Sequence, residues 1–138
     1  MLFKRLSAVL LLLCSLSLAQ AQSFINLTPK PYELKAYGGE MTLPKSFVIS
    51  TNNLPDSLAA EANTFATFSA GAYKVKVKKS NAQALVQLVF DKQLPNEAYT
   101  LDITSAKITL KAGSSAGFFY GFQSVRKMLT SDGKLPPC

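Results

Sequence analysis

The stretch SSAGFFYGFQSVRKML, from Ser114 to Leu129, has the apolar spacing of an amphipathic helix and yet contains two glycines, Gly117 and Gly121. Each glycine in a helix interior costs about 0.5–1 kcal/mol relative to alanine, so the pair costs about 1–2 kcal/mol. A packing interaction has to offset this cost. The apolar positions of the helix are Phe118, Phe122, Val125 and Leu129.

The spacing of the two glycines suggests what offsets their cost. Gly117 and Gly121 are four residues apart, so they lie one above the other on the helix surface. Without side chains at these positions, the helix axis can approach a strand or a loop closely. We expect the tighter packing of Phe118 and Phe122 that results to compensate for the glycines.

The ends of this helix carry their own signals. Ser114 or Ser115 can act as its N-terminal cap, and we expect Gly133 to end it. A second helix is expected to start at Pro55-Asp56-Ser57, with Asp56 as its cap, and to finish before Gly71. Its apolar face comprises Leu58, Ala62, Phe65 and Ala66.

The remaining apolar segments have the length and alternation of β-strands. A Gly38-Gly39 turn predicts a hairpin between the first two of them, and Thr104-Ser105-Ala106 predicts an antiparallel hairpin between the last two. The sequence thus predicts an α+β domain, with a mixed, largely antiparallel β-sheet and two α-helices packed against it. The expected strands are Glu33–Tyr37, Glu40–Leu43, Phe47–Thr51, Tyr73–Lys79, Ala84–Phe90, Glu97–Ile103 and Lys107–Ala112.

The N-terminal residues have the composition of an export signal. A basic start is followed by the apolar run Leu6 to Leu18, and Ala19-Gln20-Ala21 has the pattern that signal peptidase cleaves. The run is shorter than the roughly 20 residues that span a bilayer. We therefore expect residues 1–21 to be a signal peptide, residues 22–138 to form one domain, and the protein to be periplasmic or secreted.

The composition of residues 22–138 excludes some functions. Removing Lys4 and Arg5 from the 15 basic residues leaves 13 against 8 acidic ones, a net charge of +5 that favours polyanions only weakly. The chain contains no histidine, which excludes histidine-based catalytic triads and histidine-containing zinc sites within it. Cys138 is the one cysteine outside the signal segment, so an internal disulfide is not possible there.

The order of motifs resembles a known domain. A Pro-Lys-Pro segment (Pro29 to Pro31) and a glycine turn precede the strands EAYTLDI (Glu97 to Ile103) and KITLKA (Lys107 to Ala112), and AGFFYGFQSVRKML (Ala116 to Leu129) follows. This arrangement resembles the N-terminal, non-catalytic domain of the β-N-acetylhexosaminidases of glycoside hydrolase family 20. The resemblance runs from about Asn26 to Pro137 and is most specific at the Glu-Ala-Tyr strand and the glycine-aromatic helix.

The resemblance implies a partner domain, a catalytic (β/α)8 barrel that this domain precedes. In that family the barrel releases terminal β-linked N-acetylhexosamine by substrate-assisted hydrolysis, in which the acetamido oxygen of the substrate attacks the anomeric carbon. A glutamic acid protonates the leaving oxygen and an adjacent aspartate steadies the acetamido group. Accessory domains of other glycosidase families that act on N-acetylated sugars are similar, so this alternative stays open.

This chain lacks the catalytic pair that the resemblance implies. No two of its eight carboxylate residues are adjacent, and the sequence contains no Asp-Glu dipeptide. We expect a fragment or truncated product that is inactive alone, with no catalytic residue, no cofactor site and no metal site. The carboxylates are Glu33, Glu40, Asp56, Glu61, Asp91, Glu97, Asp102 and Asp132.

A stand-alone exported domain that binds carbohydrate or another surface is the alternative. Lys74, Lys76, Lys78 and Lys79 could hold an anionic glycan, although lysines on an edge strand more often keep it soluble. Exposed aromatic residues could stack on sugar rings. We expect no nucleic acid partner and no membrane contact after signal cleavage. The candidate aromatic residues are Tyr99, Phe119 and Tyr120.

Overall fold

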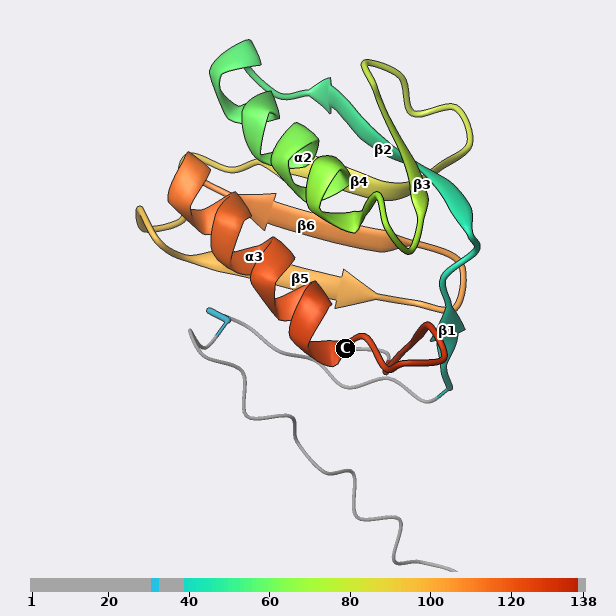
Figure 1. Cartoon of the computed structure of the whole chain (residues 1–138). Coiled ribbons are helices and arrows are strands. Elements are labelled where there is room, and N and C mark those ends of the chain that lie inside the picture. Colours follow the sequence, from blue (N-terminus) through green and yellow to red (C-terminus); the bar gives the residue numbers. More distant parts are fainter. Residues whose placement is uncertain (1–30, 33–38, 137–138) are drawn as a thin grey trace, which may run out of the picture.

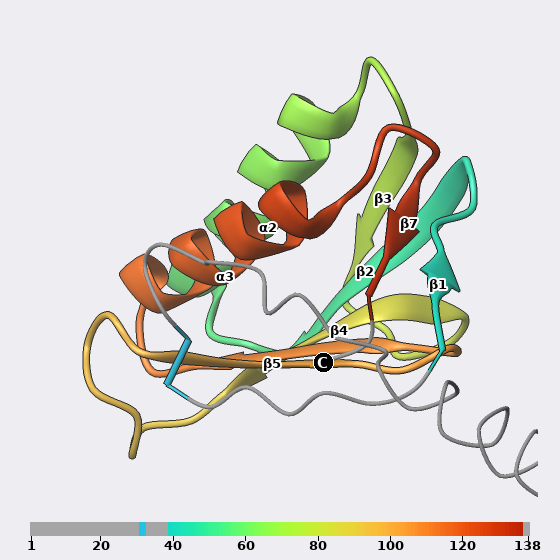
Figure 2. The ribbon, with the colours of Figure 1, turned by 90° about the horizontal axis from the view of Figure 1, so that it is seen from below.

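A five-stranded β-sheet with two helices on one of its faces forms the body of the computed structural model, which describes residues 31–32 and 39–136 (Figure 1). The order of the strands across the sheet is β3-β2-β4-β6-β5. Seen along the sheet, α2 and α3 lie on the same side of it (Figure 2). The elements of this layer pair are β2 (Ser46–Asn53), α2 (Asp56–Ser69), β3 (Lys74–Lys78), β4 (Ala84–Phe90), β5 (Tyr99–Ile103), β6 (Ile108–Ala112) and α3 (Ser115–Met128).

The α+β class, the mixed sheet and its two helices confirm the sequence prediction, as does the antiparallel β5–β6 hairpin. The sheet contains more parallel pairs than the sequence suggested, because β2–β3, β2–β4 and β4–β6 are all parallel. Helix α2 carries the chain back to the starting end of β2, so β3 runs in the direction of β2. Residues 79–83 then connect two strands on opposite sides of β2, and Asn81 in this connection accepts a 2.6 Å hydrogen bond from the buried Ser50 hydroxyl.

Helix α3 begins where the sequence predicted. The Ser114 Oγ accepts a hydrogen bond of 3.1 Å from the backbone N–H of Gly117, which satisfies one of the unpaired donors of the first turn. The helix ends at Leu129, whose backbone is extended. The prediction that Gly133 ends the helix is therefore wrong. Gly133 has a φ of +84° and lies in the turn that follows.

The two glycines of α3 face the sheet, which confirms the predicted close approach of the helix at these positions. A Cβ at Gly117 would lie 2.5 Å from the carbonyl oxygen of Ala98 and 2.9 Å from the Cβ of Ala112. A Cβ at Gly121 would lie 2.9 Å from the Cδ2 of Leu110, which is fully buried. Both helical glycines are therefore sites of close approach between α3 and the β5–β6 hairpin.

The start of α2 differs from the sequence prediction. Pro55 is the N-terminal cap residue, and no side chain caps this end. Asp56 is the first helical residue, and its carboxylate pairs with the Lys79 ammonium. The assignment of Asp56 as a cap is thus wrong. Its negative charge still lies in the first turn, where it interacts favourably with the positive end of the helix dipole.

Strands β1 (Met41–Thr42) and β7 (Lys134–Leu135) form a separate antiparallel ribbon, with Met41 paired with Leu135. The segment around residue 41 is thus a strand, as expected, and its partner is the last strand of the domain. The predicted signal peptide and the predicted Glu33–Tyr37 strand lie outside the described residues. Within the described part of the chain, neither helix has the length and apolar character needed to cross a bilayer.

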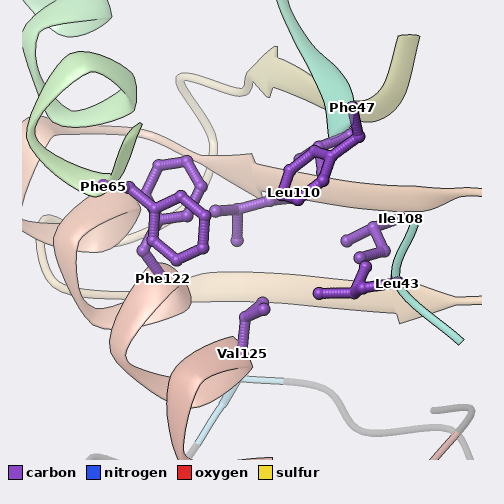
Figure 3. A pocket seen from close by; sticks show the side chains of 8 residues that line it. Leu43, Phe47, Phe65, Ile108, Leu110, Phe122 and Val125 are labelled. Atoms are coloured by element: carbon purple, nitrogen blue, oxygen red, sulfur yellow. The ribbon is translucent and has the colours of Figure 1, made fainter. Parts of the chain in front are cut away.

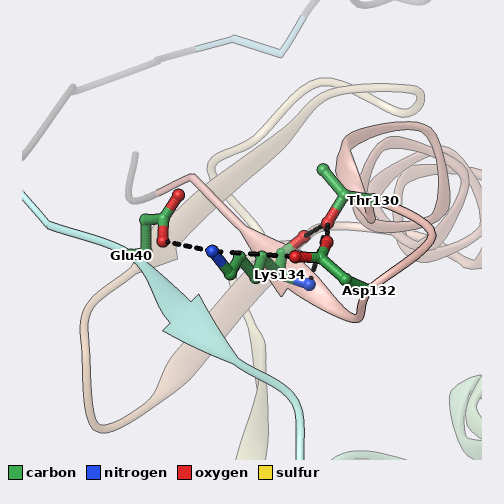
Figure 4. Close-up of polar contacts among 4 residues, drawn as sticks. All are labelled: Glu40, Thr130, Asp132 and Lys134. Atoms are coloured by element: carbon green, nitrogen blue, oxygen red, sulfur yellow. Dashed lines mark hydrogen bonds and ion pairs between the residues drawn. The ribbon is translucent and has the colours of Figure 1, made fainter.

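Ion pairs accompany this ribbon. The Lys134 Nζ lies 3.1 Å from a carboxylate oxygen of Glu40 and 3.6 Å from one of Asp132 (Figure 4). The hydrogen bond and charge of Glu40 raise the pKa of Lys134. The pKa of Asp132 is lowered, chiefly by the hydrogen bond that it accepts from the Thr130 hydroxyl. The cluster therefore favours the charged forms of Asp132 and Lys134 beside the β1–β7 ribbon.

Candidate functional site

Among the described residues, Glu40 and Asp132 are two carboxylates that lie near each other, because both are ion-pair partners of Lys134, and both are exposed. Glu97 is exposed in the turn before β5, and Asp102 is exposed on β5 itself. Glu61 is half-buried and accepts a 2.7 Å hydrogen bond from the Ser115 hydroxyl. The residues that the structure describes contain no group of three or more cysteine, aspartate or glutamate side chains positioned to hold a metal ion.

The lysines of β3 lie along one edge of the main sheet, as the sequence predicted. Lys74, Lys76 and Lys78 are exposed on the sheet face away from the helices, since Val75 and Val77 alternate with them and pack on the core. Lysines on an edge strand discourage its pairing with another chain. Their position fits this solubilising role and also leaves three ammonium groups available to an anionic ligand.

The three candidate aromatic residues do not form one sugar-stacking surface. Tyr99 is only 1% exposed, and its hydroxyl lies 2.5 Å from the Ser124 Oγ inside the core. Tyr99 thus cannot stack on a sugar. Phe119 is 42% exposed, and the half-buried Tyr120 contacts its ring edge-to-face with 5.5 Å between centroids.

A shallow groove lies between the outer surfaces of α2 and α3 and is lined by aromatic and polar side chains. Phe68, on α2, is 63% exposed, and the Arg126 guanidinium of α3 lies over its ring, 3.4 Å from the centroid. Arg126 also donates a 3.1 Å hydrogen bond from Nη1 to the side-chain oxygen of Gln123. We call this feature the helix groove; it is lined by Glu61, Thr64, Phe65, Phe68, Phe119, Phe122, Gln123 and Arg126.

The sequence prediction missed Phe68. Phe68 follows Phe65 by three residues and lies at the margin of the apolar face of α2. It is therefore not part of the face that packs on the core. Phe65 faces inward and stacks on Phe122 of α3 with 4.5 Å between ring centroids. One signal could have identified the groove from the sequence. It is a large aromatic residue at the edge of the apolar face of a helix, beside core positions that other residues already fill.

Neither cavity has the size of a sugar-binding site. The helix groove encloses about 40 Å³, whereas small-molecule sites are typically about 300–1,000 Å³. A second cavity of about 10 Å³ lies in the core between the helices and the sheet (Figure 3). Its lining side chains, which include Leu110, Phe122 and Val125, are all apolar, so it is a small packing gap.

Solved structures similar to this chain come from β-hexosaminidases. The β-N-acetylhexosaminidase of Bacteroides fragilis matches with a TM-score of 0.64 and 23% identity over 80% of this chain and 23% of that chain. The N-acetyl-β-hexosaminidase of Streptomyces plicatus matches with a TM-score of 0.68 and 18% identity over 79% and 24%. The chitobiase of Flavobacterium johnsoniae matches with a TM-score of 0.59 and 22% identity over 79% and 19%.

At these identities the structural matches establish the fold. The chain spans about a quarter or less of the length of each of these enzymes. The comparison with curated proteins gave no match. A family model described as "Glycosyl hydrolase family 20, domain 2" matches residues 25–138, which is most of the chain. The chain therefore belongs to glycosyl hydrolase family 20, as a domain 2 of that family.

Proposed function

We propose that this chain is the non-catalytic accessory domain of an exported β-N-acetylhexosaminidase, and that it supports a catalytic (β/α)8 barrel supplied by the rest of the enzyme. The observation that carries the proposal is the family match over residues 25–138 of a chain that contains no Asp-Glu dipeptide. The barrel would release terminal β-linked N-acetylhexosamine, with the acetamido group of the substrate as the nucleophile. Export rests on the signal-like residues 1–21.

The geometry of the described residues agrees with a supporting role. No carboxylate among them is fully buried, and the helix groove and the small core cavity described above are each too small for a sugar ring. The chain would thus contribute a folded surface to the enzyme, and the reacting groups would come from the barrel.

The split of roles can be tested by assaying three proteins with an aryl N-acetyl-β-glucosaminide. The longest natural polypeptide that carries this chain should release the aryl group. A variant of it in which both residues of its Asp-Glu pair are replaced by the corresponding amides should lose that activity. Residues 22–138 alone should show no turnover. Turnover by residues 22–138 would refute the proposal, as would an active full-length enzyme that keeps its activity without an Asp-Glu pair.

The alternative, a stand-alone carbohydrate-binding domain, now depends on the lysines of β3 and on the exposed Phe119, because Tyr99 is buried. Titration with chitin oligosaccharides and with an anionic glycan separates the two proposals. Saturable binding that is lost when Lys76 and Lys78 are both replaced by glutamine would favour the alternative. No saturable binding would favour the accessory role.

A further inference from the structure

We propose that the open edge of β3 is a docking site for an extended peptide strand of another protein, one that carries acidic side chains at alternate positions. Such a strand would continue the main sheet beside β3 and would place its carboxylates against Lys74, Lys76 and Lys78. We call these three residues the lysine row. The inference goes beyond the proposed function, because it concerns a binding partner of the domain and does not involve the catalytic barrel.

Strand β3 lies at the end of the main sheet, and it pairs with β2 alone among the strands that the structure describes. The opposite end of the sheet is different. There the backbone N–H of Tyr32 donates a 3.0 Å hydrogen bond to the carbonyl oxygen of Tyr99 on β5. Within the described part of the chain, the edge to which a further strand can be added is therefore the edge of β3.

The backbone of β3 presents hydrogen-bonding groups along this edge. The N–H of Lys74 donates a 2.7 Å hydrogen bond to the carbonyl oxygen of Lys45, so the backbone groups of Lys74 point toward β2. Successive residues of a strand point these groups alternately to one side and to the other. The N–H and C=O groups of Val75 and Val77 therefore point away from β2, where an added strand can pair with them.

The lysine row gives this edge its charge. Its three side chains are exposed on the sheet face away from the helices, whereas Val75 and Val77 pack on the core. Alternate residues of a strand are about 6.4–6.8 Å apart, so the row has a regular spacing. The ion pairs of the described residues involve Lys79 and Lys134, and none of them involves a member of the row. The row is thus available to acidic groups with the same spacing.

The charge of the row determines which strand the edge accepts. A second copy of β3 would bring lysines opposite lysines on the same face of the sheet, and like charges directly opposite each other destabilise a strand pair. The row therefore discourages pairing between copies of the chain. Opposite charges across a strand pair are stabilising. The occupant should therefore be an extended peptide with aspartate or glutamate at every second position.

A peptide fits this edge better than other polyanions do. An anionic glycan or a nucleic acid could neutralise the lysines, but it would leave the backbone groups of Val75 and Val77 without partners. Surfaces that bind single-stranded nucleic acid also supply aromatic side chains on which the bases stack. The large apolar side chains exposed among the described residues lie elsewhere, because Phe68 and Phe119 are on the helices and Tyr32 is beside β5.

Titration of the full-length polypeptide with two synthetic peptides of the same composition tests the proposal. In the first peptide threonine and glutamate alternate, and in the second the glutamates are grouped at one end, so that only some of them can face the row. Calorimetry at low ionic strength gives the dissociation constants. We expect the alternating peptide to bind about tenfold more tightly than the grouped one, through its additional opposite-charge pairs.

Backbone methylation of the alternating peptide provides the second measurement. Methyl groups on the nitrogen atoms that would donate to the carbonyl oxygens of Val75 and Val77 remove hydrogen bonds and leave the charge unchanged. We expect this peptide to bind about tenfold more weakly than the unmethylated one. A patch that recognised charge alone would bind both peptides equally.

Two charge-reversal variants of equal net charge identify the surface. Lys76→Glu/Lys78→Glu reverses the row, and Lys92→Glu/Lys107→Glu reverses two exposed lysines that lie outside β3. We expect the first variant to lose at least tenfold in affinity for the alternating peptide and to bind a peptide in which lysine replaces the glutamates. The second variant should bind the alternating peptide as the wild type does.

Several outcomes would overturn the inference. No binding of the alternating peptide would mean that the lysines only keep the edge soluble. Equal affinity for the alternating, grouped and methylated peptides would mean a non-specific anionic site. Tighter binding of an anionic glycan or of single-stranded DNA would mean a polyanion site. Self-association of the wild type that the row variant abolishes would mean that a second copy occupies the edge.

Discussion

Replacing Gly117 with alanine isolates the close contact between α3 and the sheet. The new methyl group would lie 2.5 Å from the Ala98 carbonyl oxygen and 2.9 Å from the Ala112 Cβ, both closer than such atoms pack. Because Ala98 contributes backbone and the Ala112 side chain has no rotamers, no side-chain rotation can relieve the overlap. Helix α3 must therefore move away from the β5–β6 hairpin, or the chain around Ala98 must shift.

The expected loss of stability follows from two opposing effects. Overpacking a well-packed core costs about 1–3 kcal/mol, and alanine recovers about 1 kcal/mol of helix propensity relative to glycine. Two contacts under 3.0 Å with atoms that cannot rotate away put the overpacking cost in the upper part of this range, at about 2–3 kcal/mol. We therefore expect a net loss of about 1–2 kcal/mol, which lowers the melting temperature of a domain of this size by roughly 4–8 °C. Urea unfolding followed by circular dichroism measures the difference in free energy directly.

The matched control is Gly71→Ala. Gly71 is exposed after the end of α2, and a Cβ there would meet nothing within 4 Å. Its replacement should change stability by no more than about 0.5 kcal/mol. The reasoning fails if Gly117→Ala is as stable as the wild type, since helix propensity would then outweigh the supposed contact.

Three further predictions use the same unfolding assay. Gly121→Val should destabilise the domain by about 1–3 kcal/mol through overlap with Leu110, and a melting temperature equal to that of the wild type would contradict this. Ser114→Ala should cost about 1 kcal/mol because it removes the N-terminal cap of α3, and an unchanged urea midpoint would show that the cap is dispensable. Asp132→Asn should be less stable than the wild type at neutral pH, because the folded state lowers the pKa of Asp132, chiefly through the hydrogen bond from Thr130. This contribution to the free energy of unfolding is present above the usual aspartate pKa of about 3.9 and disappears as the pH falls through the lowered value. A difference in the free energy of unfolding between the two proteins that stays constant down to about pH 2 would contradict the assignment.

The sequence predicts best those elements whose pattern is local. The apolar run Ala84–Phe90 has the same bounds in the structure as β4, and the alternation of lysine and valine identifies the edge strand β3. The glycines of α3 could also be explained in advance, because their spacing restricts them to one side of the helix.

The sequence predicts strand pairing less well, because neighbours in the sheet are far apart in the chain. The parallel β2–β4 and β4–β6 pairs join segments whose own patterns do not specify a direction. Local alternation did place Tyr99 on the same face as Leu101 and Ile103, and that face is buried. The sugar-stacking role of Tyr99 was therefore in conflict with a pattern that the sequence already contained.

The pairing of β1 with β7 has a consequence for how this domain can be handled. Met41 lies beside Leu135, and the backbone N–H of Tyr32 donates a 3.0 Å hydrogen bond to the carbonyl oxygen of Tyr99 on β5. Both ends of the described chain are therefore held against the fold. A linker, or a different protein, that is attached outside residues 31–136 would leave these contacts intact. A deletion that removes Leu135, which is completely buried, would instead take away a core side chain and leave β1 with no strand beside it in the described ribbon. A piece of the chain that keeps these contacts must therefore include residues 32–135.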